Sequence, residues 1–519
     1  MTRHSRRDIL RSAAALTGGA IAAGSGALPL IGSTATAQTV PGVYGTSPVR
    51  RPGGHPFLEG AFAPVREEVT AFDLPVIGRI PPELNGRYLR IGPNVLGLED
   101  PRAHHWMLGE GMVHGVRLRD GRAEWYRNRW VRSAAVAAKL GEPYPWPVPE
   151  QDYACNTHVI AHNGRILTLL ESGPLPYELD GELNTLGPYD FGGTLTGAFT
   201  AHTKLDAHAG ELHAVTYSPM WDHVRHLVVN PEGRVARTTT IPVAGSPMMH
   251  DFALTQRHVV LFDVPVTFDP EAAAAGHPVP YIWNDRHPAR VGVLPRAGGE
   301  VRWFDAPAVV VYSHTLNAYD HGTSIVVDLT TFPAPFYAAG RGSGGPGATG
   351  TPSLDRWTID LARGQVRMSR IDDQPQEYPR INDALVSRRH RFGYSAAAAE
   401  MFQAYLAVDG VPPDRAFHNA LIKHDLLRGT SEVHRFRKGA AASEPVFVPA
   451  RQPDHGPAAG NHRGAEDDGY ALAYVHNPDR DASDLVILAA QDFTGAPVAR
   501  VQLPARVPLG FHGSWVPDA

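Results

Sequence analysis

The chain has 519 residues, a formal net charge of −5 at pH 7 and 43% apolar residues, so it is large enough for two domains or for one large closed architecture. No basic block interrupts the body of the chain, which excludes nucleic acid as an expected partner. The single cysteine, Cys155, cannot form a disulfide within the chain, and a metal site would therefore rely on nitrogen and oxygen ligands. The 52 glycines and 46 prolines favour many turns between short strands.

The first 37 residues are predicted to be a twin-arginine signal peptide. "SRRDIL" (Ser5 to Leu10) precedes a weakly apolar run over residues 12–31, and "ATA" at residues 35–37 is a small-x-small cleavage signal. The alternative is a membrane anchor, but the run is rich in glycine and serine and a cleavage signal follows it. Nothing later approaches the about 18 unbroken apolar residues of a spanning helix. We expect export of the folded protein to the bacterial periplasm or beyond, with residues 38–56 as a linker or N-terminal arm.

From about residue 57 the pattern is that of β-structure. Alternating apolar and polar residues around a glycine-containing turn predict hairpins at residues 120–126, 226–241 and 360–371. Short continuous apolar runs at 258–266 and 483–493 predict strands that are buried on both faces. Helix signals are few: residues 395–408 carry the clearest one and residues 133–140 a weaker one. The segment 340–352 is predicted to be a flexible loop.

Hairpins recur from residue 85 to residue 516, and no linker divides them into halves. A long all-β chain must protect its strand edges, and radial closure into a propeller does this economically over more than 400 residues. We therefore expect residues 57–519 to form a single β-propeller domain. In such a fold a strand from the far end of the chain often completes the last blade, so the C-terminal segment is expected to be central.

Four histidines stand in or beside apolar stretches where strands are expected: His202 in "TAHTKLD", His250 in "PMMHDF", His314 in "VYSHTLNAYD" and His512 in "GFHGSW". Their wide spacing forms no compact metal motif. Taken singly, each is also explained as a buried histidine bonded to a backbone carbonyl.

A set of ordered sequence blocks joins these histidines. They are "FAPVREEV", "LNGRYLRIGPN", "HHWMLGEGMVHGVRL", "YRNRWVRS", "CNTHV", "HDFALT", "RVGVLPR", "EYPRIN", "AEDDG" and "GFHGSW". In this order they resemble the carotenoid cleavage oxygenase family from about residue 57 to the end of the chain. The resemblance implies a seven-bladed β-propeller with short helices and loops that form a dome over the metal-bearing face.

The resemblance also implies one Fe(2+) per chain, bound by His202, His250, His314 and His512. Three glutamates of the family hold three of these histidines by hydrogen bonds, and they match Glu171, Glu377 and Glu466. A carboxylate that accepts from one ring nitrogen of a ligating imidazole fixes its tautomer and orientation. Thr157 in "CNTHV" resembles a residue near the open coordination position of some relatives.

The implied activity is oxidative scission of a conjugated C=C bond of a carotenoid or apocarotenoid by O2, giving two carbonyl products. Four neutral imidazoles suit a redox-active iron, whereas zinc cannot react with O2 and prefers a closed tetrahedral site. The implied partner is an apolar conjugated small molecule in a mostly apolar tunnel. Trp106, Trp130 and Phe336 are candidates to line it, although each is also explained as core.

Three alternatives remain. Within the family, stilbene-like phenolics are cleaved by relatives that grip a phenol with a Tyr and a Lys in the early blocks. Residues 97–124 contain no Tyr, and Lys139 does not align clearly, so a carotenoid is favoured. A retinoid isomerohydrolase of animal eyes does not fit a bacterial export signal, and a non-enzymatic binding propeller would not need the glutamates. Glu110 and Val95 depart from the family's usual Asp and Pro and bear on substrate fit. The scissile bond, peripheral membrane contact and the oligomeric state stay open.

Overall fold

The computed structural model of the chain describes residues 56–97, 106–152, 155–275, 280–306, 311–332, 352–398, 419–450 and 464–518. The predicted signal peptide, nearly all of the arm 38–56 and Phe336 lie outside these residues. The predicted loop, except Pro352, and residues 399–408 of the predicted helix lie outside them too. No helix in the described part of the chain has both the length and the hydropathy to cross a membrane.

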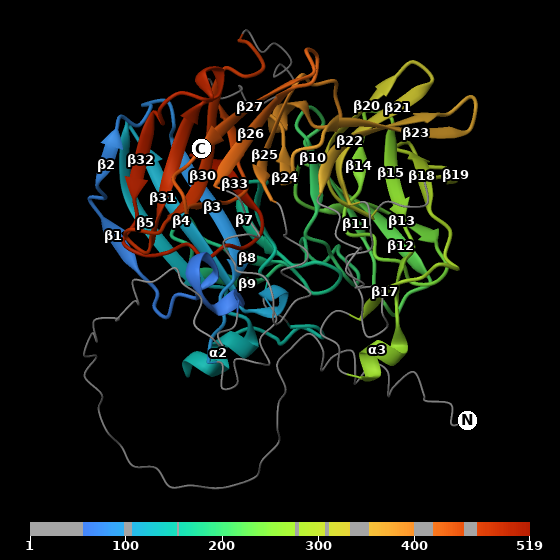
Figure 1. Cartoon of the computed structure of the whole chain (residues 1–519). Coiled ribbons are helices and arrows are strands. Elements are labelled where there is room, and N and C mark those ends of the chain that lie inside the picture. Colours follow the sequence, from blue (N-terminus) through green and yellow to red (C-terminus); the bar gives the residue numbers. More distant parts are fainter. Residues whose placement is uncertain are drawn as a thin grey trace, which may run out of the picture.

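Seven sheets of at least four strands follow one another around a ring (Figure 1). In each of these blades antiparallel strands run from an inner strand, at the axis, outward. Blade 1 contains, from the inside, β33 (Gly513–Pro517), β3 (Gly86–Pro93), β4 (Gly111–Arg119), β5 (Arg122–Trp130) and β1 (Thr70–Phe72). Blade 2 contains β6 (His158–His162), β7 (Arg165–Leu169), β8 (Tyr177–Leu179) and β9 (Thr185–Pro188). Blade 3 contains β10 (Thr203–Asp206), β11 (Glu211–Thr216), β12 (His223–Val229) and β13 (Val235–Pro242).

Blades 4 to 7 repeat this order. Blade 4 contains β14 (Ala253–Leu254), β15 (His258–Asp263), β18 (Arg290–Pro295) and β19 (Arg302–Asp305), with a separate ribbon of β16 (Val266–Phe268) and β17 (Tyr281–Trp283). Blade 5 contains β20 (Val311–His321), β21 (Ser324–Phe332), β22 (Ser353–Asp360) and β23 (Gln365–Asp372), and blade 6 contains β24 (Gln376–Arg380), β25 (Phe392–Ala397), β26 (Ala420–Asp425) and β27 (Thr430–Arg435). Blade 7 contains β28 (Ala441–Ala442), β29 (Val446–Pro449), β30 (Gly469–Asn477), β31 (Ala482–Ala489), β32 (Ala499–Gln502) and β2 (Val76–Gly78).

Both ends of the described chain close the ring. The C-terminal β33 is the inner strand of blade 1 and pairs with β3 from Gly86↔Pro517 to Arg90↔Gly513. Near the N-terminal end, β2 pairs with β32 as the outer strand of blade 7. The predicted seven-bladed propeller and the central place of its C-terminal strand are both confirmed.

The two described α-helices lie on one face of the propeller, called the helix face below (Figure 1). Helix α2 (Ala134–Leu140) joins outer strands of blade 1 to the inner strand β6, and Ser133 caps its N-terminus by accepting from the backbone N–H of Val136. Helix α3 (Pro270–Ala274) lies between β15 and β18. Because antiparallel strands alternate in direction, both connections leave the sheet at the end where the inner strands begin.

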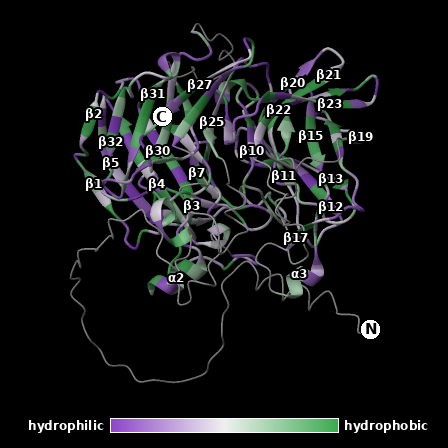
Figure 2. Ribbon diagram, in the orientation of Figure 1, coloured by the Kyte–Doolittle hydropathy of each residue, from purple (hydrophilic) through white to green (hydrophobic). Residues whose placement is uncertain are grey.

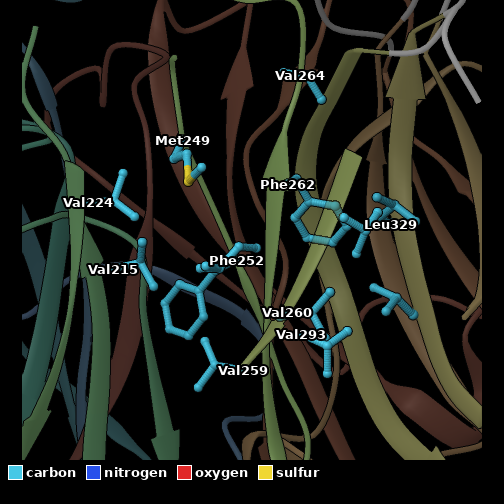
Figure 3. Close-up of a cluster of buried hydrophobic side chains, with 14 of the residues drawn as sticks. Val215, Val224, Met249, Phe252, Val259, Val260, Phe262, Val264, Val293 and Leu329 are labelled. Atoms are coloured by element: carbon cyan, nitrogen blue, oxygen red, sulfur yellow. The ribbon is translucent and has the colours of Figure 1, made fainter. Parts of the chain in front are cut away.

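The core lies between the blades, and hydrophobic residues gather along their strands (Figure 2). The largest cluster joins blades 3, 4 and 5, and includes Val215, Val224, Phe252, Val260, Phe262 and Leu329 (Figure 3). The run "HVVLFD" of β15 is buried from Val259 to Asp263, as expected for a strand covered on both faces.

Most local predictions match the elements. The hairpin turn at Asp120 and Gly121 has positive φ at both residues, and the predicted helix over 133–140 is α2. The predicted helix over 395–408 is wrong for Ser395 to Ala397, which belong to strand β25. Ser395 and Ala396 pair with Ile422 and Leu421 and are buried. Packing between neighbouring strands here overrides the helix propensity of alanine.

Candidate metal centre

Each of the seven blades supplies one side chain to a cluster at the helix-face end of the axis. Blades 1, 3, 4 and 5 supply imidazoles, and blades 2, 6 and 7 supply carboxylates. In blade order these residues are His512, Glu171, His202, His250, His314, Glu377 and Glu444. His202 and His512 directly precede β10 and β33, so the local sequence brings them to the axis at the start of an inner strand.

The four histidines predicted from sequence come together. The ring centroid of His202 lies 4.2 Å from that of His250 and 4.9 Å from that of His512. The ring centroids of His314 and His512 are 4.8 Å apart. The Nε2 atoms of His250 and His314 approach to 3.1 Å. Residues separated by up to 310 positions thus share one site.

Three of these imidazoles are held through Nδ1 by a carboxylate. The Nδ1–oxygen distances are 2.7 Å for His250 to Glu171, 2.7 Å for His314 to Glu377 and 2.9 Å for His512 to Glu444. An ionised carboxylate only accepts hydrogen bonds, so each Nδ1 carries the proton and each neutral ring presents Nε2 as a lone pair.

His202 has no such carboxylate. Its Nε2 atom is buried and has no hydrogen-bond partner among the described residues. Burial, with the neighbouring histidines, holds the pKa of His202 well below its ordinary value, so this ring stays neutral. A neutral imidazole with a buried free nitrogen is suited to bind a metal.

A metal ion fits this arrangement. Two imidazoles whose Nδ1 atoms are both protonated face each other through Nε2 lone pairs at 3.1 Å, which is unfavourable unless a proton or cation lies between them. Two nitrogens bound at about 2.1 Å to one ion and at a right angle to each other would be about 3.0 Å apart. An all-nitrogen set leaves the ion's charge uncompensated inside the ligand shell, and the carboxylates balance it one shell further out.

The charges at the cluster are unequal. Burial alone would lower the pKa of His250, but the charge of Glu171 and its hydrogen bond outweigh burial and raise it. Burial lowers the pKa of His512 to about 4, although Glu444 opposes this shift. Burial would raise the pKa of Glu377, yet His314 and the hydrogen bonds to the carboxylate lower it. Glu377 and Glu444 are therefore anions at neutral pH despite complete burial.

Glu466, the third glutamate predicted from sequence, is not part of the cluster. Its carboxylate accepts from the backbone N–H groups of Arg391 and Phe392, at 2.7–2.9 Å. It precedes β30, and Pro449 at the end of β29 pairs with Gly469, so Glu466 lies at the face opposite the helix face. The prediction is wrong because blade 7 brings Glu444, between β28 and β29, to the histidine end instead.

Thr157 lies next to His512 through the backbone. Its carbonyl accepts from the N–H of His512 at 2.9 Å, and its hydroxyl donates to Oδ1 of Asn156 at 3.0 Å. The cavity described below is not lined by Thr157. A place at an open coordination position therefore stays a prediction.

The imidazoles lie between an aromatic cluster and a cavity of mixed lining. Toward the helix face, the ring of Trp106 packs on Phe511 at 4.6 Å, and Tyr378 packs on both His314 and His512. Along the inner strands in the other direction lies a cavity of about 200 Å³, which reaches His202, His314 and His512 and is lined further on by Lys204, Asp251, Thr315 and Ser514. The cavity also has apolar lining residues, among them Ile160, Leu205, Leu316 and Ile381, so it combines charged and apolar groups beside the imidazoles.

The glycines of "GFHGSW" are required by close packing. A Cβ on Gly510 would lie 2.6 Å from Cα of Gly92, and one on Gly513 would lie 2.4 Å from the carbonyl oxygen of Leu89. Both neighbours belong to β3, so the close approach is to the next strand of the same blade. This contact, and not crowding at the axis, lets His512 reach the cluster.

Of the other residues considered from the sequence, Trp106 lies beside the histidines, whereas Trp130 and Lys139 have partners elsewhere. Trp106 belongs to the aromatic cluster beside the histidines, whereas Trp130 packs in a separate cluster with Met112 and donates through Nε1 to the carbonyl of Asn94. Lys139 on α2 pairs with Glu110 and donates to the carbonyl of Leu96. Glu110, which stands where the family usually has Asp, is thus the ion-pair partner of Lys139.

Sequence reasoning missed three residues of the site: Glu444, Arg380 and Asp251. Arg380 pairs with Glu444 at 3.2 Å, and Asp251 accepts from the N–H of Thr315 at 2.8 Å and pairs with Lys204 at 2.9 Å. A signal for Glu444 was present, because it is the lone charged residue in the apolar stretch from Gly439 to Ala450. A single carboxylate in a buried strand is unusual unless it is paired.

The chain is similar to known proteins in both sequence and fold. The family model described as retinal pigment epithelial membrane protein matches residues 62–517. The chain is similar to a carotenoid cleavage oxygenase of Mycobacterium tuberculosis (45% identity, covering 89% of this chain and 98% of the relative) and to an isoeugenol monooxygenase of Pseudomonas nitroreducens (31%, 89% and 98%). Its fold is similar to the crystal structure of Pseudomonas brassicacearum lignostilbene dioxygenase, with a TM-score of 0.77, 28% identity, and 89% and 98% of the two chains covered.

Proposed function

Because the chain belongs to the carotenoid cleavage oxygenase family, which includes carotenoid cleavage dioxygenases, we propose that it is an Fe(II)-dependent dioxygenase that cleaves a conjugated C=C bond of a carotenoid or apocarotenoid into two carbonyl products. The observation that carries the proposal is the convergence of four imidazoles, three of them fixed through Nδ1 by Glu171, Glu377 and Glu444. His202, His250, His314 and His512 would hold one iron through Nε2.

The iron would supply the redox chemistry that lets O2 react with an alkene. The chain's own residues orient the partners. The glutamates keep three of the four imidazoles in one tautomer, and the aromatic cluster with Trp106, Phe511 and Tyr378 makes the helix-face side of the rings apolar.

A phenolic alkene is the second candidate substrate. Two proteins to which the chain is similar are named isoeugenol monooxygenase and lignostilbene dioxygenase. The pairing of Lys139 with Glu110 argues against a lysine that is free to bind a phenol. The relative at 45% identity is named for carotenoids, so a carotenoid remains the first candidate.

Metal analysis tests the site. We expect about one iron per chain in the wild-type protein purified without chelator, and a loss of most of it in His314→Ala. His213→Ala is the matched control, because His213 is equally buried but lies in β11, outside the cluster. Equal iron in all three proteins, or none in a folded wild-type protein that also rebinds no Fe(II), would contradict the proposal.

A substrate panel under O2 tests the chemistry. Carotenoids, apocarotenoids, stilbenes and isoeugenol are incubated with the iron-loaded protein, and products are identified by mass spectrometry with ¹⁸O2. We expect carbonyl products labelled from O2 with a carotenoid-type substrate. Activity on the phenolic alkenes alone would assign the second candidate instead, and no O2-dependent product from any class would sink the dioxygenase proposal.

Export is proposed on the sequence signal alone. The twin-arginine signature at Ser5 to Leu10 favours transport of a folded, iron-loaded protein across the membrane. Fractionation of cells that make the full chain and an Arg6→Lys, Arg7→Lys variant measures this. Export of both proteins alike would contradict the proposal.

A further inference from the structure

We propose that Tyr378 is a positioning residue of the histidine cluster, whose ring packs against both His314 and His512 and sets the angle between their rings. The inference rests on the proposed function only in that the cluster binds a metal. Tyr378 is not one of the proposed metal ligands, and it follows Glu377 directly in sequence.

The backbone of Tyr378 is in the left-handed region, at φ +54°. Few residues other than glycine, asparagine and aspartate adopt this conformation, which is strained for a bulky side chain. Here it turns the N–H of Tyr378 back onto Oε2 of Glu377, at 2.6 Å. The same oxygen accepts from Nδ1 of His314 at 2.7 Å, so the strained turn holds the carboxylate that holds the histidine.

The ring of Tyr378 contacts two imidazoles at once. It is stacked on His314, with the centroids 5.5 Å apart and the planes at 25°, and it meets His512 edge-on at 5.3 Å and 75°. His314 comes from blade 5 and His512 from blade 1, and their rings are 4.8 Å apart. A rigid ring buried against both fixes their mutual orientation.

The hydroxyl anchors the far end of the ring. It donates to the carbonyl oxygen of Gly510 at 3.2 Å, two residues before His512. Tyr378 therefore contacts the carboxylate of Glu377, which binds His314, and the backbone at Gly510, which leads to His512. Its ring also packs on the rings of both histidines. These contacts would set the ligand angles that a bound metal experiences.

Cobalt binding tests the inference without relying on turnover. The visible absorption of bound Co²⁺ depends on ligand geometry, and titration of the metal-free full chain gives an affinity from the same data. In Tyr378→Leu we expect a changed cobalt spectrum and an affinity about tenfold weaker, in the range found when groups that orient ligands are removed. In Tyr378→Phe, which keeps the ring and loses one hydrogen bond, we expect the wild-type spectrum and an affinity within about threefold.

Phe191 offers a matched control. It too is a buried aromatic residue in the left-handed region, at φ +56°, but its ring packs on Tyr189 and Phe199. Phe191→Leu is expected to lose stability as Tyr378→Leu does, with an unchanged cobalt spectrum and affinity. A purely structural role for Tyr378 predicts that the two leucine variants behave alike.

The outcomes separate this inference from the proposed function. A wild-type spectrum and affinity in folded Tyr378→Leu overturn the inference and leave the metal centre standing. If that variant does not fold, Tyr378→Trp replaces it, because a larger ring against His314 and His512 must also alter the cobalt spectrum. An unaltered cobalt spectrum in Tyr378→Trp overturns the inference. A wild-type chain that binds no Co²⁺ overturns both, and binding without any alkene cleavage overturns the proposed function only.

Discussion

The three glutamates of the cluster share one task but have different partners. Glu171 also accepts from the hydroxyl of Tyr217, and Glu377 accepts from the hydroxyl of Thr330 at 2.7 Å. Glu444 instead faces a cation, Arg380, and accepts from the N–H of Gly513 at 2.8 Å. The positive charge of Arg380 draws electron density from the Glu444 carboxylate. The hydrogen bond from His512 Nδ1 to this carboxylate therefore raises the basicity of Nε2 least among the three imidazoles.

Glu444 gives the prediction at the residue scale. Glu444→Gln keeps the shape but replaces the acceptor of His512 Nδ1 with an amide and removes one of the two carboxylates that pair with Arg380, the other being Asp383. We expect metal affinity to fall by about 10- to 100-fold, measured by competition with a chelator.

Glu466→Gln is its control. Glu466 bonds to the backbone of β25, so this change should leave metal affinity within about twofold of the wild type and cost about 1–2 kcal/mol of the free energy of unfolding. The reverse ranking would mean that the sequence-based choice of Glu466 had been right and the geometry around Glu444 misleading.

At the scale of elements, strand β15 shows how the blades are joined. Its side chains are buried on both faces, and Phe262 packs with Leu329 of blade 5 and with Trp357 of β22, whose ring lies 5.8 Å away edge-on (Figure 3). The sequence predicted this strand because a short apolar run without alternation is typical of such burial. It mispredicted Ser395 to Ala397 because alanine carries no signal for which neighbour will cover it.

Phe262 gives the prediction at this scale. Phe262→Ala should cost about 3–5 kcal/mol of the free energy of unfolding, since the ring is fully buried and its loss leaves a cavity between blades 4 and 5. Phe72→Ala, in the edge strand β1 and 60% exposed, should cost less than about 0.5 kcal/mol. Urea unfolding of both variants measures the difference. Equal costs would show that β15 is not part of the inter-blade core.

At the scale of the molecule, a ring of polar contacts joins all seven inner strands. The successive contacts, starting from blade 1, are His512 N–H to Thr157 O, His158 Nδ1 to Ala201 O, Lys204 to Asp251, Asp251 to Thr315, His314 to Glu377, Arg380 to Glu444 and Glu444 to His512. The histidine cluster and the closure of the propeller therefore depend on the same contacts. Loss of closure should disorganise the cluster.

Asp518 lies at the closure and gives a prediction for pH. It pairs with Arg87 at 2.7 Å, Arg119 at 2.9 Å and Arg117 at 3.3 Å, which ties the end of β33 to blade 1. Burial would raise the pKa of Asp518, but the hydrogen bond from Arg119 and the charges of Arg117 and Arg87 lower it below 3.8. A lowered pKa in the folded state stabilises the protein above the ordinary pKa, and this stability is lost as the pH falls through the folded value.

We therefore expect Asp518→Asn to lower the free energy of unfolding by about 1 kcal/mol at pH 7, a value that allows for partial solvent screening. The difference from the wild type should shrink as the pH falls below about 4. Urea unfolding at pH 7, 4 and 3 checks this, with the exposed Asp373→Asn as control. A deficit that stays constant down to pH 3 would contradict the role of the carboxylate charge.

The sequence by itself determined the features that depend on neighbouring residues and on ordered motifs. Turn residues and apolar runs predicted β-hairpins along the whole chain, and the ordered blocks, through the family that they resemble, predicted seven blades and the four imidazoles of His202, His250, His314 and His512 that meet at the axis. These signals are local, so folding does not change them.

Only the tertiary structure decided which carboxylate binds His512 and which ring packs against both His512 and His314. Glu444 and Glu466 lie in the same blade, and the direction of β29 and β30 places one at the helix face and the other at the opposite face. The sequence gives no sign that Tyr378 differs from other strand residues. In the structure its backbone is left-handed, and its ring packs against histidines from blades 5 and 1. Both depend on contacts between residues far apart in sequence, which propeller closure creates.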